Sequence, residues 1–304
     1  MKIYINSPKE SWVVDRFVKE WKENNKNIST NLLSKADLIW IISPWTWKKL
    51  SKKHLSSKKV ICTIHHIDDK KFNVEEFSEL DKLVDRYHII SKKTENTLKQ
   101  LTKKDIFYSP FWIDSKKFFN IKDSQSLRKK FNLKDNDFAI GSFQRDTEGS
   151  DNKSPKLEKG PDNFIEIIKN LDYENKNLKV VLTGKRRNYI INKLNELKIS
   201  FEYFEMVDNK RLNELYNSLD LYIVASRVEG GPQSILESAL SKTPIISTDV
   251  GVANQILSDK SIFTMEEYKN AKPNVEHAYR EVQKYIIPKG FESFINFFED
   301  VYES

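Results

Sequence analysis

Short runs of apolar residues alternate with helix-like patterns along the whole chain. Such apolar runs are typical of buried parallel strands, and the segments between them place apolar residues three or four positions apart, as amphipathic helices do. This alternation is the pattern of βα units, in which a helix returns the chain to the same edge of a sheet. The sequence therefore predicts an α/β protein with doubly wound, Rossmann-like sheets.

The first half of the chain predicts one such sheet. Its strands are expected at Lys2–Ile5, Asp37–Ile42, Lys59–Ile64, Tyr87–Ile90 and, as a short strand, Ile106–Tyr108. Its helices are expected from about Lys9 to Asn24, near Trp47, and from Lys92 to Leu101. Strands that are apolar on both faces indicate a parallel sheet covered by helices on both sides.

The second half repeats this architecture. Its strands are expected at Phe138–Phe143, Lys179–Thr183, Phe201–Phe204, Leu221–Ala225, Pro244–Ser247 and Ile262–Thr264. Its helices are expected at about Glu158–Leu171, Asn188–Leu197, Asn209–Ser218, Pro232–Ser241 and from Val275 onward, with a break near Pro288. Two sheets predict two domains, and 304 residues are enough for two separate cores.

An aromatic segment after Pro110 separates the halves. It interrupts the strand and helix pattern and predicts an ordered crossover. We therefore expect a first domain over residues 1–118 and a second domain over residues 119–288. The last helix, about residues 289–304, is expected to pack back onto the first domain through an aromatic stripe formed by Phe291, Phe294, Phe297 and Phe298.

Cysteine usage and hydropathy bear on the compartment. The single cysteine, Cys62, lies inside an apolar run, which predicts a buried thiol and excludes an intramolecular disulfide. The first six residues have the pattern of a strand rather than of a signal peptide, and no run of about 18 apolar residues occurs. We therefore expect a soluble, cytoplasmic protein.

The net charge of +7 is concentrated in the first domain. Residues 1–120 hold 24 Lys and Arg against 15 Asp and Glu, a balance of +9, which leaves −2 for the rest. Six lysines lie between Lys48 and Lys59, close to Trp45 and Trp47. Two interpretations are open. The segment meets an anionic acceptor or the anionic inner face of the membrane, or it is a solvated helix face whose tryptophans enter the core.

Two glutamates eight residues apart, Glu229 and Glu237, mark the clearest chemical pattern in the chain. Between them lie a predicted turn and the start of a helix, formed by Gly230, Gly231, Pro232, Gln233 and Ser234. Glycines permit a tight turn, proline suits the first helical position, and the free amides of a helix N-terminus favour phosphate. Carboxylates on either side of a diphosphate can hold sugar hydroxyls. The segment predicts a nucleotide-sugar site, although similar turns occur in α/β proteins without one.

Cationic residues follow the neighbouring strands. Arg145 lies in the turn after the first strand of the second domain, and Lys159 lies at the start of the next helix. Because the carboxyl ends of parallel strands meet at one edge, we expect both side chains near the glycine turn, where they can neutralise a diphosphate. The run Gly184-Lys185-Arg186-Arg187 follows another strand at this edge and either adds positive potential or caps a surface turn. No carboxylate cluster has the spacing of a metal site, so no metal is expected.

In the first domain, His65 and His66 directly follow the predicted strand Lys59–Ile64. A histidine at the carboxyl end of a strand can hydrogen-bond a substrate hydroxyl or orient an acceptor, which makes His66 a catalytic candidate. The alternative is a histidine that is satisfied by local backbone groups.

From Tyr216 to Gly251 the chain resembles the retaining GT-B glycosyltransferases of family 4, the glycosyl transferases group 1. The resemblance consists of a tyrosine-led helix, a strand, two glutamates separated by seven residues, and a Pro-led strand that ends in Asp-Val-Gly. It implies a GT-B fold, with two Rossmann-like domains that face a central cleft. It also implies retaining sugar transfer that requires no metal.

The same resemblance implies roles for individual residues. Arg145 and Lys159 correspond to the arginine and lysine that bind the donor diphosphate, Glu229 to the residue that holds the donor sugar, and Glu237 to the residue that holds the ribose. The chain also departs from the family pattern. Gln144 stands where a glycine is usual, the spacing from arginine to lysine is longer, and the N-terminal glycine-rich loop is absent. Acceptor recognition therefore does not transfer from the resemblance.

We expect this protein to transfer a sugar from a UDP- or GDP-linked donor to a hydroxyl of a glycan or glycolipid acceptor, in the synthesis of cell-surface glycans. A nucleotide-sugar epimerase of the same fold is an alternative, because it needs the donor but no acceptor. A non-catalytic nucleic-acid-binding protein is disfavoured, since the second half carries a charge of −2 and no basic, aromatic binding module is recognisable.

Overall fold

The computed structural model describes residues 1–10, 13–68, 72–173 and 176–304. Within these ranges the chain divides into two compact units, one formed by Met1–Trp112 with Tyr285–Ser304 and the other by Ile113–Lys284. Each unit contains a six-stranded sheet whose paired strands all run parallel. The predicted α/β class with two Rossmann-like sheets is confirmed.

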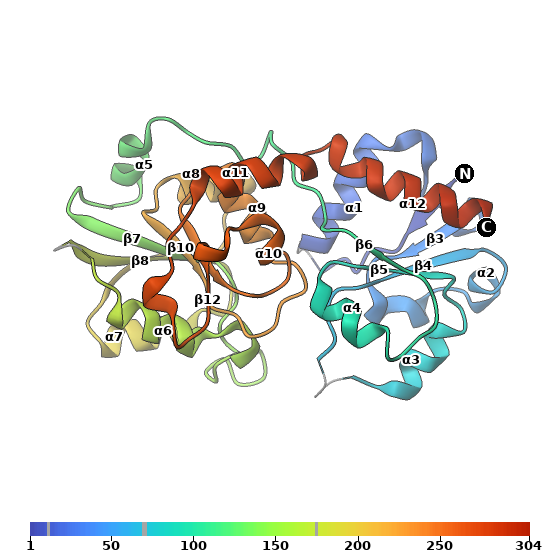
Figure 1. Ribbon diagram of the computed structural model, residues 1–304, viewed down its shortest axis with the longest axis horizontal. Helices are drawn as coiled ribbons and strands as arrows, with labels where there is room; N and C mark the ends of the chain where they lie inside the picture. The colour runs from blue at the N-terminus through green and yellow to red at the C-terminus, as the bar shows by residue number, and fades with distance from the viewer. Residues whose placement is uncertain (11–12, 69–71, 174–175) are drawn as a thin grey trace. The chain divides into compact units, whose positions relative to one another are not determined.

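The first unit has the strand order β2-β1-β3-β4-β5-β6. Helices α1 (Val13–Asn24) and α12 (Glu292–Glu303) cover one face of this sheet, and α3 (Val74–Asp81) and α4 (Lys92–Leu98) cover the other (Figure 1). The strands are β1 (Ile3–Ile5), β2 (Ser29–Thr30), β3 (Leu38–Ile41), β4 (Lys59–Ile64), β5 (Arg86–Ile89) and β6 (Ile106–Tyr108). Strands β3, β4 and β5 are almost entirely buried, as expected for a sheet covered on both faces.

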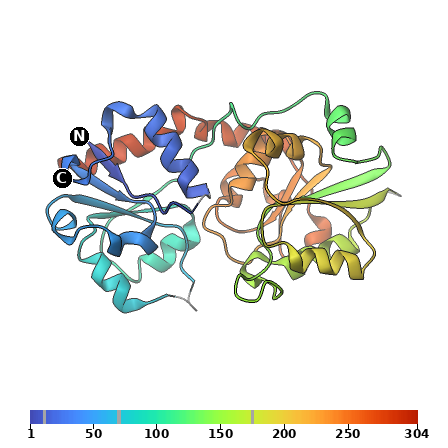
Figure 2. The ribbon, with the colours of Figure 1, turned by 180° about the vertical axis from the view of Figure 1, so that it is seen from behind.

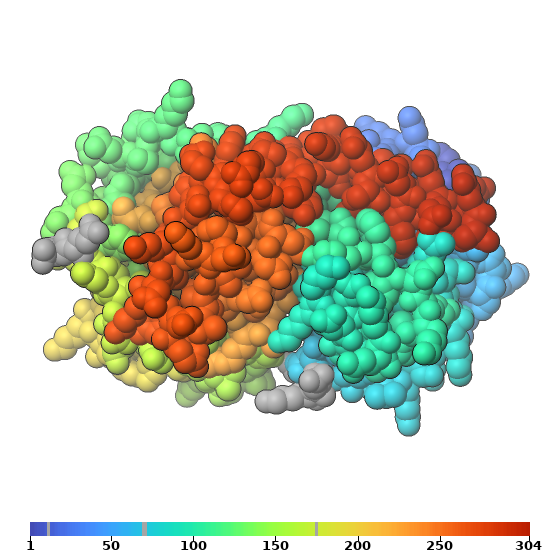
Figure 3. Space-filling model, viewed as in Figure 1, coloured from blue at the N-terminus to red at the C-terminus, as the bar shows by residue number. Residues whose placement is uncertain are grey.

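Aromatic rings fill the layer between this sheet and α12. The ring of Phe298 lies 5.3 Å from that of Trp21 and 5.0 Å from that of Trp40, and Phe297 stacks on Phe107 at 4.3 Å. The terminal helix thus completes the core of the first unit with the phenylalanine stripe. Its opposite side forms part of the unit's surface, in red in Figure 3.

The second unit has the strand order β12-β11-β10-β7-β8-β9. The strands are β7 (Asp137–Ser142), β8 (Asn177–Thr183), β9 (Ser200–Phe204), β10 (Leu221–Val224), β11 (Ile245–Thr248) and β12 (Ile262–Phe263). Helices α6 (Pro161–Asn170) and α7 (Asn188–Glu196) lie on one face. On the other lie α8 (Asn209–Asn217), α9 (Gln233–Leu240) and α11 (Val275–Val282), and Figure 2 shows these layers from behind. The strand order reverses between β7 and β10.

Among the described residues, two helices of seven or more residues were not predicted, namely α3 and α5 (Ser124–Lys130). Both are short and bury few residues, which leaves little apolar periodicity to detect: α5 buries only Leu127. Each has a local N-terminal marker, because the side chains of Asn73 and Asp123 accept hydrogen bonds from backbone amides three residues on. The two-residue strand β2 and the short helix α10 (Ala253–Ile256) were also missed.

The predicted start of the first helix falls partly on residues 11–12, outside the described residues, and the described part of α1 begins at Val13. Other predicted boundaries differ by a few residues. The predicted break near Pro288 is present, where 3-10 turns at Gln283–Tyr285 and Lys289–Phe291 separate α11 from α12. Cys62 is buried, as predicted, and burial raises the pKa of its thiol. No helix among the described residues is long and apolar enough to cross a bilayer.

One of the two interpretations of the basic segment from Lys48 to Lys59 made it one face of a single helix. The structure does not have such a helix in this segment. The segment comprises the end of a 3-10 helix (Pro44–Lys49), the one-turn helix α2 (Lys52–Leu55) and the start of β4. Trp47 is buried, whereas Trp45 keeps 45% of its surface exposed. The expectation that both tryptophans enter the core is therefore wrong for Trp45.

Candidate active site

The candidate site lies at the carboxyl ends of β7 and β10, where the strand order of the second unit reverses. These strands are neighbours, with Leu221 opposite Ile140 and Tyr222 opposite Gly141. The segments that follow them therefore leave the sheet side by side. In open parallel sheets this reversal is the usual place for a ligand, because the following loops diverge to opposite faces and leave a crevice.

Lys159 and Glu229 meet at this edge. Nζ of Lys159 donates a hydrogen bond of 2.6 Å to Oε2 of Glu229, and the side chains keep 24% and 11% exposure. Ser226, just beyond β10, lies 3.1 Å from the other carboxylate oxygen of Glu229 through its hydroxyl. Two of the predicted site residues, 70 positions apart, are thus in direct contact. They are partly buried but remain within reach of a ligand.

A tight backbone turn delivers Lys159 to this place. Gly160 adopts the left-handed conformation (φ 59°), and a Cβ atom there would overlap the carbonyl oxygen of Ala225 at the end of β10. Only glycine meets both conditions without strain. Pro161 then begins α6 at the first helical position, which the proline ring favours. The side-chain amide of Gln144 fixes the turn further by donating to the carbonyl of Lys159 at 2.9 Å.

An arginine joins the glutamate turn to the start of α6. The guanidinium of Arg227 donates two hydrogen bonds to the carboxylate of Asp162, at 2.7 and 2.6 Å, and the Arg227 amide donates to the carbonyl of Glu158 at 2.8 Å. The hydrogen bonds from Arg227 hold the pKa of Asp162 below its usual value, so the pair stays charged at neutral pH. These contacts therefore join the segment that carries Glu229 to the segment that carries Lys159.

The glycine turn between the two glutamates differs in detail from the prediction. Pro232 precedes the first residue of α9 and is its N-cap, and Gln233 and Ser234 form the first turn. Neither Gly230 nor Gly231 is left-handed; that conformation occurs instead at Gly251 (φ 57°), which packs against both Gly230 and Pro232. The close backbone approach expected of the pair is therefore made by Gly251. The amides at the start of α9 still face the carboxyl edge of the sheet, as expected for a helix that follows β10.

Glu237 lies one turn further into α9 and is almost fully buried, with 5% exposure. Its carboxylate accepts a hydrogen bond of 2.9 Å from the hydroxyl of Tyr216, on α8. A buried carboxylate needs such partners, because an unpaired charge away from water is strongly unfavourable. The sequence offered the spacing from Glu229 but gave no indication of this contact.

The remaining cationic candidates have different surroundings. Arg145 is exposed and has no hydrogen bond or ion pair to any described residue, so its guanidinium is available to a ligand. Gly184, left-handed with φ 91°, follows β8 at the same edge, and Lys185 beside it is exposed. Arg187 belongs to the same cationic run, and its buried, structural role was not predicted. It is buried, and its guanidinium donates to Asp146 at 2.5 Å and to the backbone of β7 and β8, so it supports the turn that carries Arg145.

The two candidate histidines belong to the first unit. His65 is half-buried, and its Nε2 lies 2.8 Å from the carbonyl of Ile42; burial lowers its pKa to about 4. His66 is exposed. The backbone-satisfied alternative therefore describes His65, and the catalytic assignment of His66 stays a prediction.

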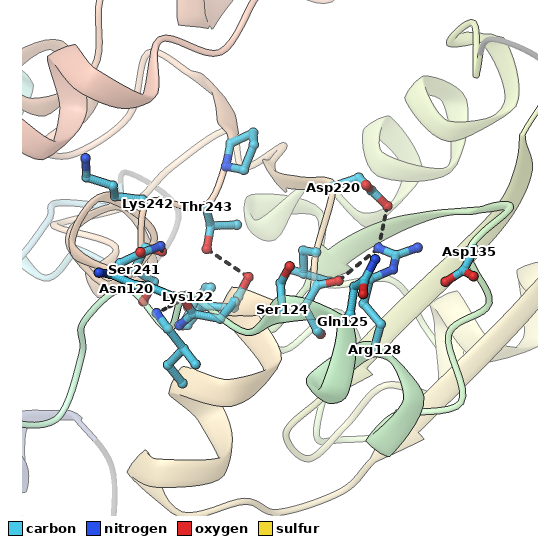
Figure 4. Close-up of a pocket in the computed structure, with 16 residues that line it drawn as sticks. Asn120, Lys122, Ser124, Gln125, Arg128, Asp135, Asp220, Ser241, Lys242 and Thr243 are labelled. Atoms are coloured by element: carbon cyan, nitrogen blue, oxygen red, sulfur yellow. Dashed lines mark hydrogen bonds and ion pairs between the residues drawn. The ribbon is translucent and has the colours of Figure 1, made fainter.

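A cavity of about 440 Å³ lies at the opposite, amino-terminal edge of the second sheet, at the ends of α8 and α9 (Figure 4). Arg128, in its wall, donates to Asp220 at 2.8 Å and to the carbonyl of Ser218 at 3.2 Å, and Asn120 donates to the carbonyl of Ser241. These polar groups are thus paired with one another. Among the described residues, no group of His, Cys, Asp and Glu side chains is arranged to hold a metal ion.

Two parallel six-stranded sheets, the second with a glycine turn and a Lys–Glu pair where its strand order reverses, define the GT-B class of fold. Solved structures agree. HepE of Anabaena in complex with UDP and glucose superposes with a TM-score of 0.74 at 12% identity, covering 99% of this chain and 100% of that one. Sucrose-phosphate synthase of Thermosynechococcus elongatus superposes with a TM-score of 0.65 at 14% identity, covering 98% and 80%.

A third structure, the pneumococcal O-GlcNAc transferase GtfA in complex with UDP and GlcNAc, superposes with a TM-score of 0.60 at 15% identity. It covers 88% of this chain and 57% of the transferase. No curated protein matches the sequence significantly. The family model of the glycosyl transferases group 1 matches residues 154–285, the segment that carries Lys159, Glu229 and Glu237.

Proposed function

We propose that this protein is a retaining glycosyltransferase that moves a sugar from a nucleotide diphosphate donor to a hydroxyl acceptor. The observation that carries the proposal is the contact of Lys159 with Glu229 at the strand reversal, inside the segment that matches the group 1 family. An ammonium group suits a diphosphate, and a neighbouring carboxylate suits the hydroxyls of the attached sugar. The UDP and sugar bound by HepE and by GtfA lend support to a UDP-linked donor.

In this proposal the positive groups stabilise the leaving diphosphate. Lys159 exchanges Glu229 for the diphosphate when the donor binds, and exposed Arg145 and the N-terminal end of the α9 dipole add to the positive field. The bond from the anomeric carbon to the diphosphate oxygen breaks, and a bond to the acceptor oxygen forms on the same face. The acceptor proton passes to the leaving phosphate oxygen. These residues supply the charge stabilisation, so we propose that the reaction requires no added metal.

We further propose a cytoplasmic enzyme that acts on a glycan or glycolipid, with the first unit on the acceptor side and His66 near the acceptor. The exposed side chains of Trp45, Lys49, Lys52 and Lys53 give the first unit a basic, aromatic surface suited to an anionic membrane face. Binding to lipid vesicles that ignores their anionic lipid content would contradict this location.

Donor binding and turnover test the proposal. UDP-, GDP- and ADP-sugars are screened by thermal shift, because a bound donor stabilises the folded state.

With the donor that binds, Lys159→Ala and Arg145→Ala are each expected to lower kcat about 100-fold or more, as is typical for lost transition-state charge stabilisation. Lys169→Ala, which removes an exposed lysine from the last turn of α6, serves as the matched control. Full turnover by the Lys159 variant, or activity abolished by a chelator and restored by Mg²⁺, would contradict the proposal. NMR of the donor incubated alone would reveal an epimerase.

A further inference from the structure

The buried carboxylate of Glu237 and the hydroxyl of Tyr216 form a fixed unit inside the second domain. Their hydrogen bond is 2.9 Å long, and the two residues keep only 5% and 1% exposure. A hydrogen bond to a charged acceptor is stronger than one between neutral groups, and more so away from water. The orientation of the Glu237 carboxylate is therefore coupled to the position of Tyr216.

The ring of Tyr216 is itself held in place. It packs edge-on against Phe143 at 4.9 Å and lies 5.3 Å from the ring of Tyr222, while Thr243 donates to the Tyr216 carbonyl at 2.8 Å. Burial raises the pKa of Tyr216 well above its usual value, and the nearby carboxylate of Glu237 raises it further. The hydroxyl therefore keeps its proton at neutral pH and acts as a fixed donor.

We propose that Tyr216 is a positioning residue for nucleotide recognition, whose hydroxyl holds the Glu237 carboxylate in the orientation that accepts hydrogen bonds from the ribose of a nucleoside diphosphate. This inference rests on the proposed function, which places the nucleotide at α9. Tyr216 acts through Glu237 and does not contact the ligand. The physical advantage is preorganisation, because a glutamate side chain that is already ordered loses less conformational freedom when the ligand binds.

A thermodynamic cycle between protein and ligand tests this role. Binding of UDP and of 2′,3′-dideoxy-UDP, which lacks the ribose hydroxyls, is measured by titration calorimetry for wild type and for Tyr216→Phe. The variant is expected to bind UDP about tenfold more weakly and 2′,3′-dideoxy-UDP within about twofold of wild type. Tyr173→Phe is the matched control: its hydroxyl donates to the carbonyl of Ile168 elsewhere in the same unit, and its removal should leave both affinities unchanged.

Turnover gives a second readout. A positioning role in donor binding predicts that Tyr216→Phe raises the KM for the donor about tenfold with kcat within about twofold of wild type, whereas a general loss of order lowers kcat. Equal losses of affinity for the two nucleotides would overturn the inference. If Tyr216→Phe does not fold, 3-fluorotyrosine at position 216 keeps the hydroxyl and makes it a stronger donor. Its effect should then be confined to UDP, and equal effects on both nucleotides would overturn the role.

Failure of the inference is distinguishable from failure of the proposed function. If wild-type protein binds GDP or ADP but not UDP, the same comparison uses that nucleotide and its 2′,3′-dideoxy form. If it binds none of UDP, GDP and ADP, the proposed function is overturned and this inference with it. If wild type binds the nucleotide but does not distinguish it from its dideoxy form, the role of Tyr216 is overturned while the glycosyltransferase proposal stands.

Discussion

At the scale of single residues, the contact between Lys159 and Glu229 gives the site a defined state before any ligand arrives. Each charged group neutralises the other at 2.6 Å. A nucleoside diphosphate offers a new partner to Lys159 but none to Glu229, so its binding separates the pair at a cost. A nucleotide sugar offers partners to both. In the proposed function, the pair therefore favours the intact donor over the nucleotide product.

Removing the carboxylate should reverse that preference. Glu229→Ala leaves Lys159 without its partner, and we expect it to bind UDP about threefold to tenfold more tightly than wild type, since no ion pair must be broken. The same variant should lose most of its turnover with a UDP-sugar, because the sugar hydroxyls have lost their acceptor. Titration calorimetry with UDP and initial rates with the donor measure the two effects.

The control must separate this exchange from a general change in net charge. Glu166→Ala removes one negative charge from the exposed side of α6 in the same unit, and it should leave UDP affinity unchanged. Weaker UDP binding by Glu229→Ala would mean that the carboxylate supports the nucleotide site rather than competing for Lys159.

At the scale of elements, the site depends on a loop that approaches the end of a strand closely. Between β7 and α6 the chain passes through Gly160, whose left-handed backbone lies against the carbonyl of Ala225. Replacing this glycine by alanine strains the backbone and forces the loop away from β10. We expect Gly160→Ala to lower the free energy of unfolding of the second unit by at least about 2 kcal/mol and to abolish turnover. Urea unfolding followed by circular dichroism measures the stability.

Gly149 provides the comparison within the same loop. Its added Cβ would meet only the mobile end of the Arg186 side chain, so Gly149→Ala should change stability by no more than about 0.5 kcal/mol. Equal stability of the Gly160 variant and wild type would show that the turn relaxes without harm.

The sequence predicted the elements that bury an apolar surface. The strands at the strand reversal, β7 and β10, were found because both faces are apolar, and α6 and α9 because a glycine or proline marks their start. Helix α5, with one buried residue, has no such pattern. At the site, the environment of Arg187 could not be predicted, because a run of Lys and Arg residues does not show which side chain is buried. The fold shows that the Arg187 guanidinium is enclosed by Asp146 and two strands.

The same limit applies to pairing. Lys159, Glu229 and Glu237 were recognised in the sequence, and the meeting of Lys159 with the turn after β10 at one edge followed from the rule for parallel strands. The particular contacts were not predictable, because each depends on side-chain positions set by the packing of several elements.

At the scale of the whole molecule, the two units have separate cores with different chemistry. All six tryptophans lie in residues 1–112, so tryptophan fluorescence reports on the first unit alone. That core also encloses a histidine. His88 is fully buried: its Nδ1 lies 3.0 Å from the Thr63 hydroxyl, and its Nε2 lies 2.9 Å from the carbonyl of Ser109. The Thr63 hydroxyl accepts a hydrogen bond from the indole N–H of Trp40, so it donates its own proton to Nδ1 of His88. The imidazole proton of His88 is therefore on Nε2, which donates to the carbonyl of Ser109.

This histidine makes the first unit sensitive to acid. Burial lowers the pKa of His88 to about 3, whereas an unfolded histidine titrates near 6.5. Between these values the unfolded chain binds a proton that the folded ring does not, so the stabilising effect is complete above pH 6.5 and declines as the pH falls. From pH 6.5 to pH 5 we expect His88 alone to contribute a loss of about 1.6 kcal/mol to the free energy of unfolding, and His65, whose pKa is lowered to about 4, to contribute a similar loss. The total is measured by urea titration with tryptophan fluorescence. His88→Gln should remove about half of this pH dependence, while His277→Gln, in the second unit, should leave it intact. A fluorescence midpoint that does not move between pH 6.5 and pH 5 would mean that the buried ring accepts a proton inside the folded core.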